Sequence, residues 1–317
     1  MYKSCPLYAL QSKKMLMKVL GIQDKKWTKN IYVQQNISPF IDCMVKPRLV
    51  EAPKQELKVI QKRIKNGLMK CRFPNYIFSG VKGKSYIDNA KMHAGIKYLY
   101  KIDISAFFPN TSREKVYMFF KNELKTSSDV AEIVTNLCTY DISIDLVEKK
   151  EIDTFIRMKK IKHINHLCTG ASPSPLLSYL VNKSMFDEMY SLCLKYNVNM
   201  SVYVDDVVFS CDKPIQPEFR GRILKIVLKN GYNISKNKVK YYGSSDVKKV
   251  TGVIIKPDGT LDVPNKLKFK VTKRFKDTQK GSELNKLYGC VIAAKQIKKN
   301  IYPSISEYIM NQKKKEK

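Results

Sequence analysis

The feature that most constrains the fold is the run from Met200 to Ser210, where two adjacent aspartates, Asp205 and Asp206, separate two apolar, β-branched segments. Such segments form strands, and a two-residue break between them predicts a β-hairpin with the aspartates at or next to its turn. Adjacent carboxylates repel each other and lose hydration, so a purely structural turn would more cheaply use Asn-Gly or Asp-Gly. A divalent cation against the carboxylates would explain the pair, and a solvated acidic turn is the alternative.

The charge of the chain favours a polyanionic partner. Its 317 residues include 59 Lys and Arg against 28 Asp and Glu, a formal net charge of +31. These basic residues are spread along the whole chain, so we expect a broad cationic surface or channel that binds phosphate backbones. No stretch of about 18 apolar residues occurs, and no membrane partner is expected.

The cysteines and the first residues bear on location. The eight cysteines have no Cys-x-x-Cys spacing, and the start lacks the apolar run of a signal peptide. We therefore expect a cytoplasmic protein with free thiols. His163, His166 and Cys168 lack a fourth metal ligand, which favours a polar surface segment over a zinc site. The Ser79–Ser85 loop lacks the spacing of a nucleotide-binding P-loop and is expected to face a nucleic-acid backbone.

Apolar periodicity predicts the main elements of the chain. Helices are expected from Lys54, from near Ser112, after Pro175, and from Phe219 until Asn230-Gly231 stops the last of them. The stripe after Pro175 extends to Met189 in what reads as one helix. Strands are expected at Tyr98–Ile104, which carries Asp103 near its end, and at Lys249–Ile255. Asp103 is then a further carboxylate at a strand end, where a capping role is the plainer interpretation.

Four segments in order resemble the palm motifs of reverse transcriptases, over roughly residues 45–265. They are Asp103 with Phe107-Phe108, Thr169 to Pro175, Tyr203 to Asp206, and Gly231 to Lys238. Two more, Asn89-Ala90-Lys91-Met92-His93 and Val250-Thr251-Gly252, are similar to elements of bacterial retron reverse transcriptases.

The resemblance implies an α+β, right-hand polymerase fold with fingers, a palm with an antiparallel sheet, a helical thumb and no RNase H domain. The expected divisions are 1–98 for an N-terminal segment and fingers, 99–125 for palm, 126–168 for a fingers/palm insertion, 169–256 for palm, and 257–317 for thumb and a basic tail.

The resemblance also implies the catalytic residues. Nucleotide addition in this family uses two Mg²⁺ ions, which prefer oxygen ligands. Asp103 and Asp205 are the expected ligands, with the Ile104 carbonyl, and Asp206 completes the site or orients the primer end. Lys238 is expected to protonate the leaving pyrophosphate or to neutralise its charge.

Further residues are assigned by their place in the motifs. Arg48 resembles the arginine of the fingers that binds the triphosphate, and Phe108 the steric gate that excludes a ribose 2′-hydroxyl. A solvated arginine and a core phenylalanine are the plainer interpretations. Thr169 and Gly170 complete the dNTP site, although the family commonly has Gln in place of Thr169. The expected nucleic-acid contacts are Lys82, Lys84, Asn89, His93, Tyr203, Val250, Thr251, Gly252, Lys266, Lys268 and Lys270.

A retron resemblance implies more about partners. Such an enzyme copies part of its own non-coding RNA from an internal guanosine 2′-hydroxyl, giving RNA-linked DNA called msDNA. An effector protein and a role in defence against phage are implied by the family alone. The alternatives are a defence or abortive-infection reverse transcriptase that primes differently, and a non-catalytic RNA-binding protein. The two retron elements argue against the former, and the three aspartates against the latter.

Overall fold

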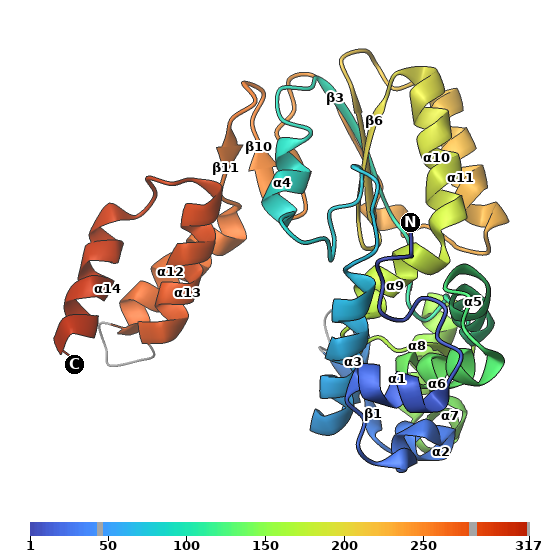
Figure 1. Cartoon of the computed structure of the whole chain (residues 1–317). Helices are drawn as coiled ribbons and strands as arrows, with labels where there is room; N and C mark the ends of the chain where they lie inside the picture. The colour runs from blue at the N-terminus through green and yellow to red at the C-terminus, as the bar shows by residue number, and fades with distance from the viewer. Residues whose placement is uncertain (43–46, 279–283, 316–317) are drawn as a thin grey trace.

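The computed structural model, which describes residues 1–42, 47–278 and 284–315, has three groups of elements (Figure 1). A central antiparallel sheet with its flanking helices is the palm, and a helical group at the bottom of the view is the fingers. Three C-terminal helices standing to one side are the thumb. This is the right-hand α+β arrangement that the resemblance implies.

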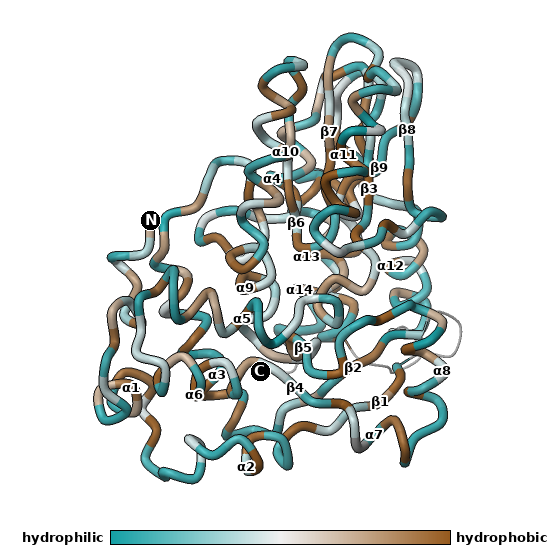
Figure 2. Tube along the Cα trace, turned by 90° about the vertical axis from the view of Figure 1, so that its right-hand side faces the viewer, coloured by the Kyte–Doolittle hydropathy of each residue, from teal (hydrophilic) through white to brown (hydrophobic). Residues whose placement is uncertain are grey.

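The palm sheet has the strand order β6 (Asn199–Tyr203), β7 (Asp206–Cys211), β3 (Tyr98–Asp103) and β8 (Lys240–Tyr242). All three pairings are antiparallel. Because side chains alternate along a strand, Tyr100 and Phe209 pack into the main core while Leu99 and Val208 join a second cluster on the other face. Figure 2 shows the apolar stretches, in brown, among these strands.

Helices cover both faces of the palm sheet. On the main-core face lie α9 (Ser174–Val181), α10 (Lys183–Tyr196) and α11 (Pro217–Lys229). The other face is covered by α4 (Tyr86–Lys91), whose Ile87 and Ala90 are buried with Leu99. Both faces of the sheet are thereby covered, while Asp103 and Asp206, at one end of β3 and β7, line a cavity.

The fingers combine a hairpin with a set of helices. The hairpin pairs β1 (Ile37–Asp42) with β2 (Arg48–Pro53), and a second short pair joins β4 (Thr139–Asp141) to β5 (Asn165–Leu167). The helical elements around them are α1 (Lys13–Leu20), η1 (Lys25–Thr28), α2 (Asn30–Gln34), α3 (Gln55–Leu68), α5 (Arg113–Met118), η2 (Phe119–Glu123), α6 (Ser128–Cys138), α7 (Ser143–Glu148) and α8 (Lys150–Lys159).

A small sheet connects the palm to the thumb. After the short η3 (Lys236–Lys238) and β8, the strands β9 (Lys248–Val250), β10 (Val253–Ile255) and β11 (Leu261–Asp262) form it. The thumb helices α12 (Asn265–Thr278), α13 (Leu284–Ile297) and α14 (Pro303–Lys315) pack around their own buried cluster, which includes Val271, Leu287 and Ile309. No helix in the described parts of the chain is both long and apolar enough to cross a bilayer.

Most predicted elements are confirmed, and two are wrong. The single helix expected after Pro175 is two helices, because Asn182 leaves the helical path and its amide group bonds the Ser178 carbonyl. The strand expected at Lys249–Ile255 is a hairpin, since Thr251 and Gly252 both have positive φ and form its turn. Residues 43–46, within the expected fingers, and the last two residues of the expected basic tail lie outside the described residues.

Candidate active site

The hairpin of the Asp-Asp motif forms as predicted. Tyr203 pairs with Asp206, which leaves Val204 and Asp205 as the two loop residues. Val204 has a φ of 60°, a left-handed conformation that is costly for a β-branched residue. The amide of Ile104 donates a hydrogen bond to the Asp205 carbonyl at 2.9 Å, which fixes this turn against the end of β3.

Asp103 meets the adjacent Asp205 and Asp206 at this point, although about a hundred residues separate it from them in sequence. Asp103 lies directly opposite Asp206 in the register of β3 and β7, and Asp205 precedes it in the turn. Burial raises the pKa of Asp205 to about 6, and the charges of Asp103 and Asp206 add to the shift. The three side chains therefore share one electrostatic environment, as the sequence predicts.

Two lysines act as counter-ions in the structure. Lys238 Nζ lies 2.7 Å from Asp103 Oδ2, while Ser235 Oγ donates to Asp103 Oδ1 at 2.6 Å. Lys101 Nζ lies 2.8 Å from Asp206 Oδ2. Within the described residues, no three His, Cys, Asp or Glu side chains are arranged to hold an ion. Each of the two lysines lies against an oxygen of one carboxylate.

The donor set nevertheless fits a hard divalent cation. Carboxylate oxygens are the ligands that Mg²⁺ prefers, and the mutual repulsion that raises the pKa of Asp205 is what a cation would relieve. Ile104 and all three aspartates line one cavity, and the expected part of the Ile104 carbonyl in holding an ion stays a prediction.

That cavity, of about 1340 Å³, joins the palm to the fingers. Arg48, exposed at the start of β2, lines it together with Phe108, Thr169 and Lys238. Phe107 is instead buried, with its ring edge against Phe186 and Tyr232. Both phenylalanines border the cavity, but Phe107 is 3% exposed and held in the aromatic cluster, while Phe108 is half-buried. The expected contact of Phe108 with a sugar stays a prediction.

Thr169 and Gly170 are tied to the fingers. Thr169 Oγ1 accepts a hydrogen bond from the Glu51 amide at 2.9 Å, so the hydroxyl is occupied by protein. A Cβ on Gly170 would collide with the Glu51 carbonyl oxygen, which explains glycine at a close approach of two backbones. Their expected contact with dNTP stays a prediction.

Three of the expected nucleic-acid contacts are wrong, because Asn89, His93 and Val250 are fully buried. Both ring nitrogens of His93 lie 2.7 Å from a serine hydroxyl, those of Ser210 and Ser201. Burial lowers the pKa of His93 to about 3, so the ring is a neutral core group.

The two retron-like elements meet each other instead. Asn89 Nδ2 lies 3.4 Å from Thr251 Oγ1, and Thr251 Oγ1 donates to the Tyr86 carbonyl at 2.7 Å. They thereby join α4 of the palm to the β9–β10 turn before the thumb.

The remaining expected nucleic-acid contacts divide by exposure. Lys84 Nζ donates to the carbonyls of Asn75 and Ile77, so it braces its own loop, and burial lowers its pKa. Lys268 is paired with Asp262. Lys82, Gly252, Lys266 and Lys270 are exposed, and Tyr203 is half-buried.

Sequence reasoning missed several residues. Lys101 is two positions before Asp103 on one strand, so the alternation of strand side chains could have placed it beside the aspartates. Glu51 shares the inward positions of β2 with Leu49 and Pro53, an uncommon place for a carboxylate. His166 is buried rather than in a polar surface segment, because Glu51 lies against it.

Comparisons with known proteins agree with this geometry. The family model described as "Reverse transcriptase (RNA-dependent DNA polymerase)" matches residues 34–255. The Retron Se72 reverse transcriptase of Salmonella heidelberg (strain 579083-10) is 28% identical over 222 residues, covering 67% of this chain and 52% of that protein. The chain thus spans about half the length of that relative.

Two Escherichia coli proteins are also similar to this chain. The Retron Ec83 reverse transcriptase is 26% identical over 253 residues, covering 77% of each chain. The Retron Ec86 reverse transcriptase is 24% identical over 210 residues, covering 66% of this chain and 58% of the relative.

Proposed function

The chain belongs to the reverse transcriptase family, and from that premise we propose that it is an RNA-directed DNA polymerase of the retron type. The observation that carries the proposal is the pairing of Asp103 with Asp206 in adjacent strands, with Asp205 in the turn beside them. These carboxylates open into a cavity that Arg48, Phe108 and Lys238 also line, which is large enough for a nucleotide and a primer end.

Asp103 and Asp205 would hold two Mg²⁺ ions together with the Ile104 carbonyl, and Asp206 would complete the site or orient the primer end. Two such ions supply activation of the attacking hydroxyl and stabilisation of the leaving pyrophosphate. Lys101 and Lys238 balance the carboxylate charge from within the chain. Lys238 lines the cavity, so its ammonium group can also neutralise or protonate pyrophosphate.

The cavity walls select the substrate. Arg48 would bind the triphosphate, because a guanidinium group donates paired hydrogen bonds to phosphate oxygens. Phe108 lines the same cavity, where its bulky ring would exclude a 2′-hydroxyl and favour deoxynucleotides.

The template we propose is a cognate structured non-coding RNA. Synthesis of DNA on this template, primed by a 2′-hydroxyl group of the RNA, would give DNA that is covalently linked to RNA. The contact between Asn89 and Thr251, from two retron-like elements, supports this over a reverse transcriptase that primes differently. An effector protein and a role in defence against phage follow from the same resemblance.

The test is synthesis by purified protein with its co-purified RNA, dNTPs and Mg²⁺. We expect DNA whose 5′ end is joined to RNA through a 2′-hydroxyl, as sequencing across the junction would show. The Asp205→Asn, Asp206→Asn double variant should make no DNA while it still binds RNA. DNA with a free 5′ end would favour the differently primed enzyme, and unchanged cellular activity of the double variant would favour a non-catalytic RNA-binding protein.

A further inference from the structure

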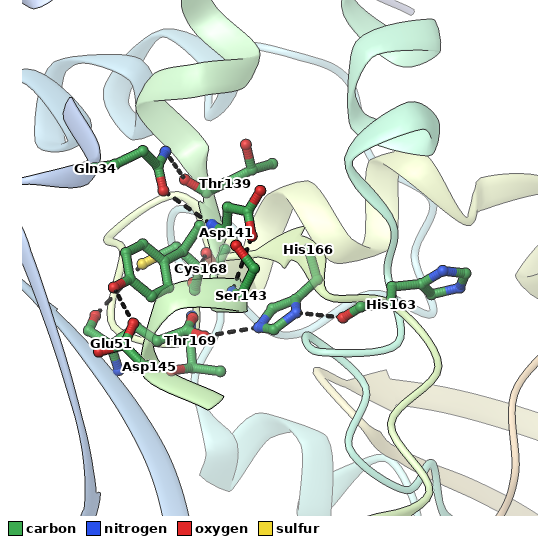
Figure 3. Close-up of polar contacts among 12 residues, drawn as sticks. Gln34, Glu51, Thr139, Asp141, Ser143, Asp145, His163, His166, Cys168 and Thr169 are labelled. Carbon is green, nitrogen blue, oxygen red and sulfur yellow. Dashed lines mark hydrogen bonds and ion pairs between the residues drawn. The ribbon is translucent and has the colours of Figure 1, made fainter. Parts of the chain in front are cut away.

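A fully buried carboxylate, Glu51, joins the fingers strand β2 to β5 and to the segment that follows it (Figure 3). Glu51 Oε1 lies 2.7 Å from His166 Nε2, and both side chains are 0% exposed. Glu51 Oε2 accepts a hydrogen bond from the Thr169 amide at 2.7 Å. In return, the Glu51 amide donates to Thr169 Oγ1 at 2.9 Å. One buried residue thus makes three contacts with two residues more than a hundred positions away.

The backbone of Glu51 also lies close to the segment that contains Thr169. Cys168 Sγ lies 3.4 Å from the Glu51 carbonyl oxygen, and a side chain on Gly170 would collide with the same oxygen. Residues 168–170 therefore lie directly against Glu51, and any shift of β2 must move this segment or break its contacts.

The hydrogen bonds of His166 require a shared proton. Its Nδ1 lies 2.7 Å from the His163 carbonyl oxygen, which can only accept, so Nδ1 carries a hydrogen. Its Nε2 faces a carboxylate oxygen, and one proton must lie between the two atoms whichever atom formally holds it. Without that proton, a nitrogen lone pair would face a carboxylate oxygen in a site from which water is excluded.

The electrostatics agree with this requirement. Burial lowers the pKa of His166, but the charge of Glu51 and the hydrogen bonds to Glu51 and His163 raise it by more, so the pKa lies above its ordinary value. His166 therefore keeps its proton to a higher pH than an ordinary histidine does. The other titratable or charged groups around the pair are Asp141, Tyr140, Asp145, Cys168 and His163.

Strand alternation connects this pair to the nucleotide site. Glu51 points inward on β2, while Arg48 is exposed and lines the cavity with Val50. Because β2 is a short strand, fixing its inward side chain fixes where the outward side chains stand.

We propose that Glu51 and His166 are positioning residues that hold β2, and with it Arg48, against the Thr169–Gly170 segment at the spacing that dNTP binding needs, through one shared proton. The proposal rests on the proposed polymerase function. It also explains Thr169 where the family commonly has Gln, because here the threonine hydroxyl accepts from Glu51.

The first test separates positioning from simple stability. Glu51→Ala should raise the KM for dNTP about 10- to 100-fold with kcat within about threefold, since small misplacements of binding groups cost this much. Glu56→Ala, a change of an exposed glutamate on α3, is the matched control and should leave KM unchanged. An unchanged KM in Glu51→Ala would overturn the proposal. So would an equal loss of kcat, RNA affinity and melting temperature, which would show a packing role only.

A double-mutant cycle tests the link to Arg48. If Glu51 acts by placing Arg48, then Arg48→Ala with Glu51→Ala should raise KM no more than Arg48→Ala alone. Multiplying effects would show that the two residues act independently and would contradict the proposal.

The second test follows the shared proton through the pH dependence of KM, and it uses a variant that keeps the contacts of Glu51. In Glu51→Gln the amide can donate to a neutral His166 and accept from the Thr169 amide, so the contacts survive without the shared proton. The wild-type KM for dNTP should rise as pH increases through the pKa of His166. The KM of the Gln variant should stay flat there and rise on acidification instead. Parallel pH profiles of the two proteins would overturn the proposal.

A measurement that does not depend on catalysis distinguishes failure of the proposed function from failure of the shared-proton proposal. If the wild type makes no DNA with RNA, dNTPs and Mg²⁺, the proposed function fails, and thermal melting across pH still tests the pair. The melting temperature of the wild type should fall as pH rises through the pKa of His166, while that of Glu51→Gln should not. Superimposable melting profiles would refute the shared proton.

Discussion

At the scale of single residues, two adjacent phenylalanines at the cavity differ in how far their rings are buried. Phe107 and Phe108 both line the cavity, yet Phe107 is buried in an aromatic cluster while Phe108 is half-buried. Alternation alone could not assign them, because residues 104–112 follow the strand in an irregular path.

We predict that Phe108→Val relaxes the choice of sugar. Removing the ring leaves room for a 2′-hydroxyl, so incorporation of rNTP relative to dNTP should rise by roughly 10- to 200-fold, the range for a small steric difference in a pocket. Single-nucleotide addition with each substrate measures the ratio. Phe107→Leu is the control and should lower stability without changing the ratio. An unchanged ratio in Phe108→Val would remove the gate assignment.

His93 gives a prediction for acid stability. Its pKa is lowered to about 3 by burial, so between this value and about 6.5 the unfolded chain binds more protons than the folded one. Stability is therefore full above pH 6.5 and is lost as pH falls, by about 2 kcal/mol at pH 5. Urea unfolding at pH 7 and pH 5 measures the loss, and His93→Gln should lack this component. Equal pH dependence in both proteins would contradict it.

At the scale of elements, α4 and the β9–β10 turn form the connection between palm and thumb. Thr251 has a φ of 44° and donates to the Tyr86 carbonyl, and its hydroxyl also meets Asn89. The two retron-like elements therefore serve first as a structural joint, with Gly252 exposed on its outer side.

We predict energetic coupling across this joint. Asn89→Ala and Thr251→Ala should each lower the free energy of unfolding by about 1–2 kcal/mol, because each removes the hydrogen bond between the two side chains, and Thr251→Ala also removes the bond to the Tyr86 carbonyl. The double variant should lose less than the sum of the two, by about 0.5–1 kcal/mol. Denaturant unfolding of the four proteins measures the coupling. Strict additivity would mean that the two elements do not act as a unit.

The accuracy of the sequence-based predictions differed between elements for physical reasons. The Asp-Asp hairpin, β3 and α3 were predictable because strong apolar periodicity coincides with their final burial. The β9–β10 hairpin was missed because its two strands read as one apolar run, and only the positive φ values of Thr251 and Gly252 divide it. Glu51 was missed because its partner His166 is 115 residues away, and no local pattern announces such a pair.

At the scale of the whole molecule, the lysines that give the chain its positive charge are of two kinds. Some are paired with a carboxylate, and others are exposed to solvent, where they can meet a phosphate. Lys101 and Lys238 are committed to aspartates of the active site, and Lys268 to Asp262. Lys266 and Lys270 on α12 are exposed, on a thumb that stands to one side of the palm (Figure 1).

We predict that these two thumb lysines set part of the salt dependence of RNA binding. In Lys266→Gln with Lys270→Gln, the slope of log affinity against log salt should decrease by about 2, roughly one for each phosphate contact. Fluorescence anisotropy with the co-purified RNA at several salt concentrations gives the slope. Lys268→Gln is the matched control and should change it less, because Asp262 already holds that ammonium group. An unaltered slope in the double variant would place the RNA elsewhere.

The lysine partners of Asp103 and Asp206 have a consequence for ion uptake. Two ammonium groups already compensate two of the three clustered acids. A divalent cation that enters the site would therefore compete with Lys101 and Lys238 for carboxylate oxygens.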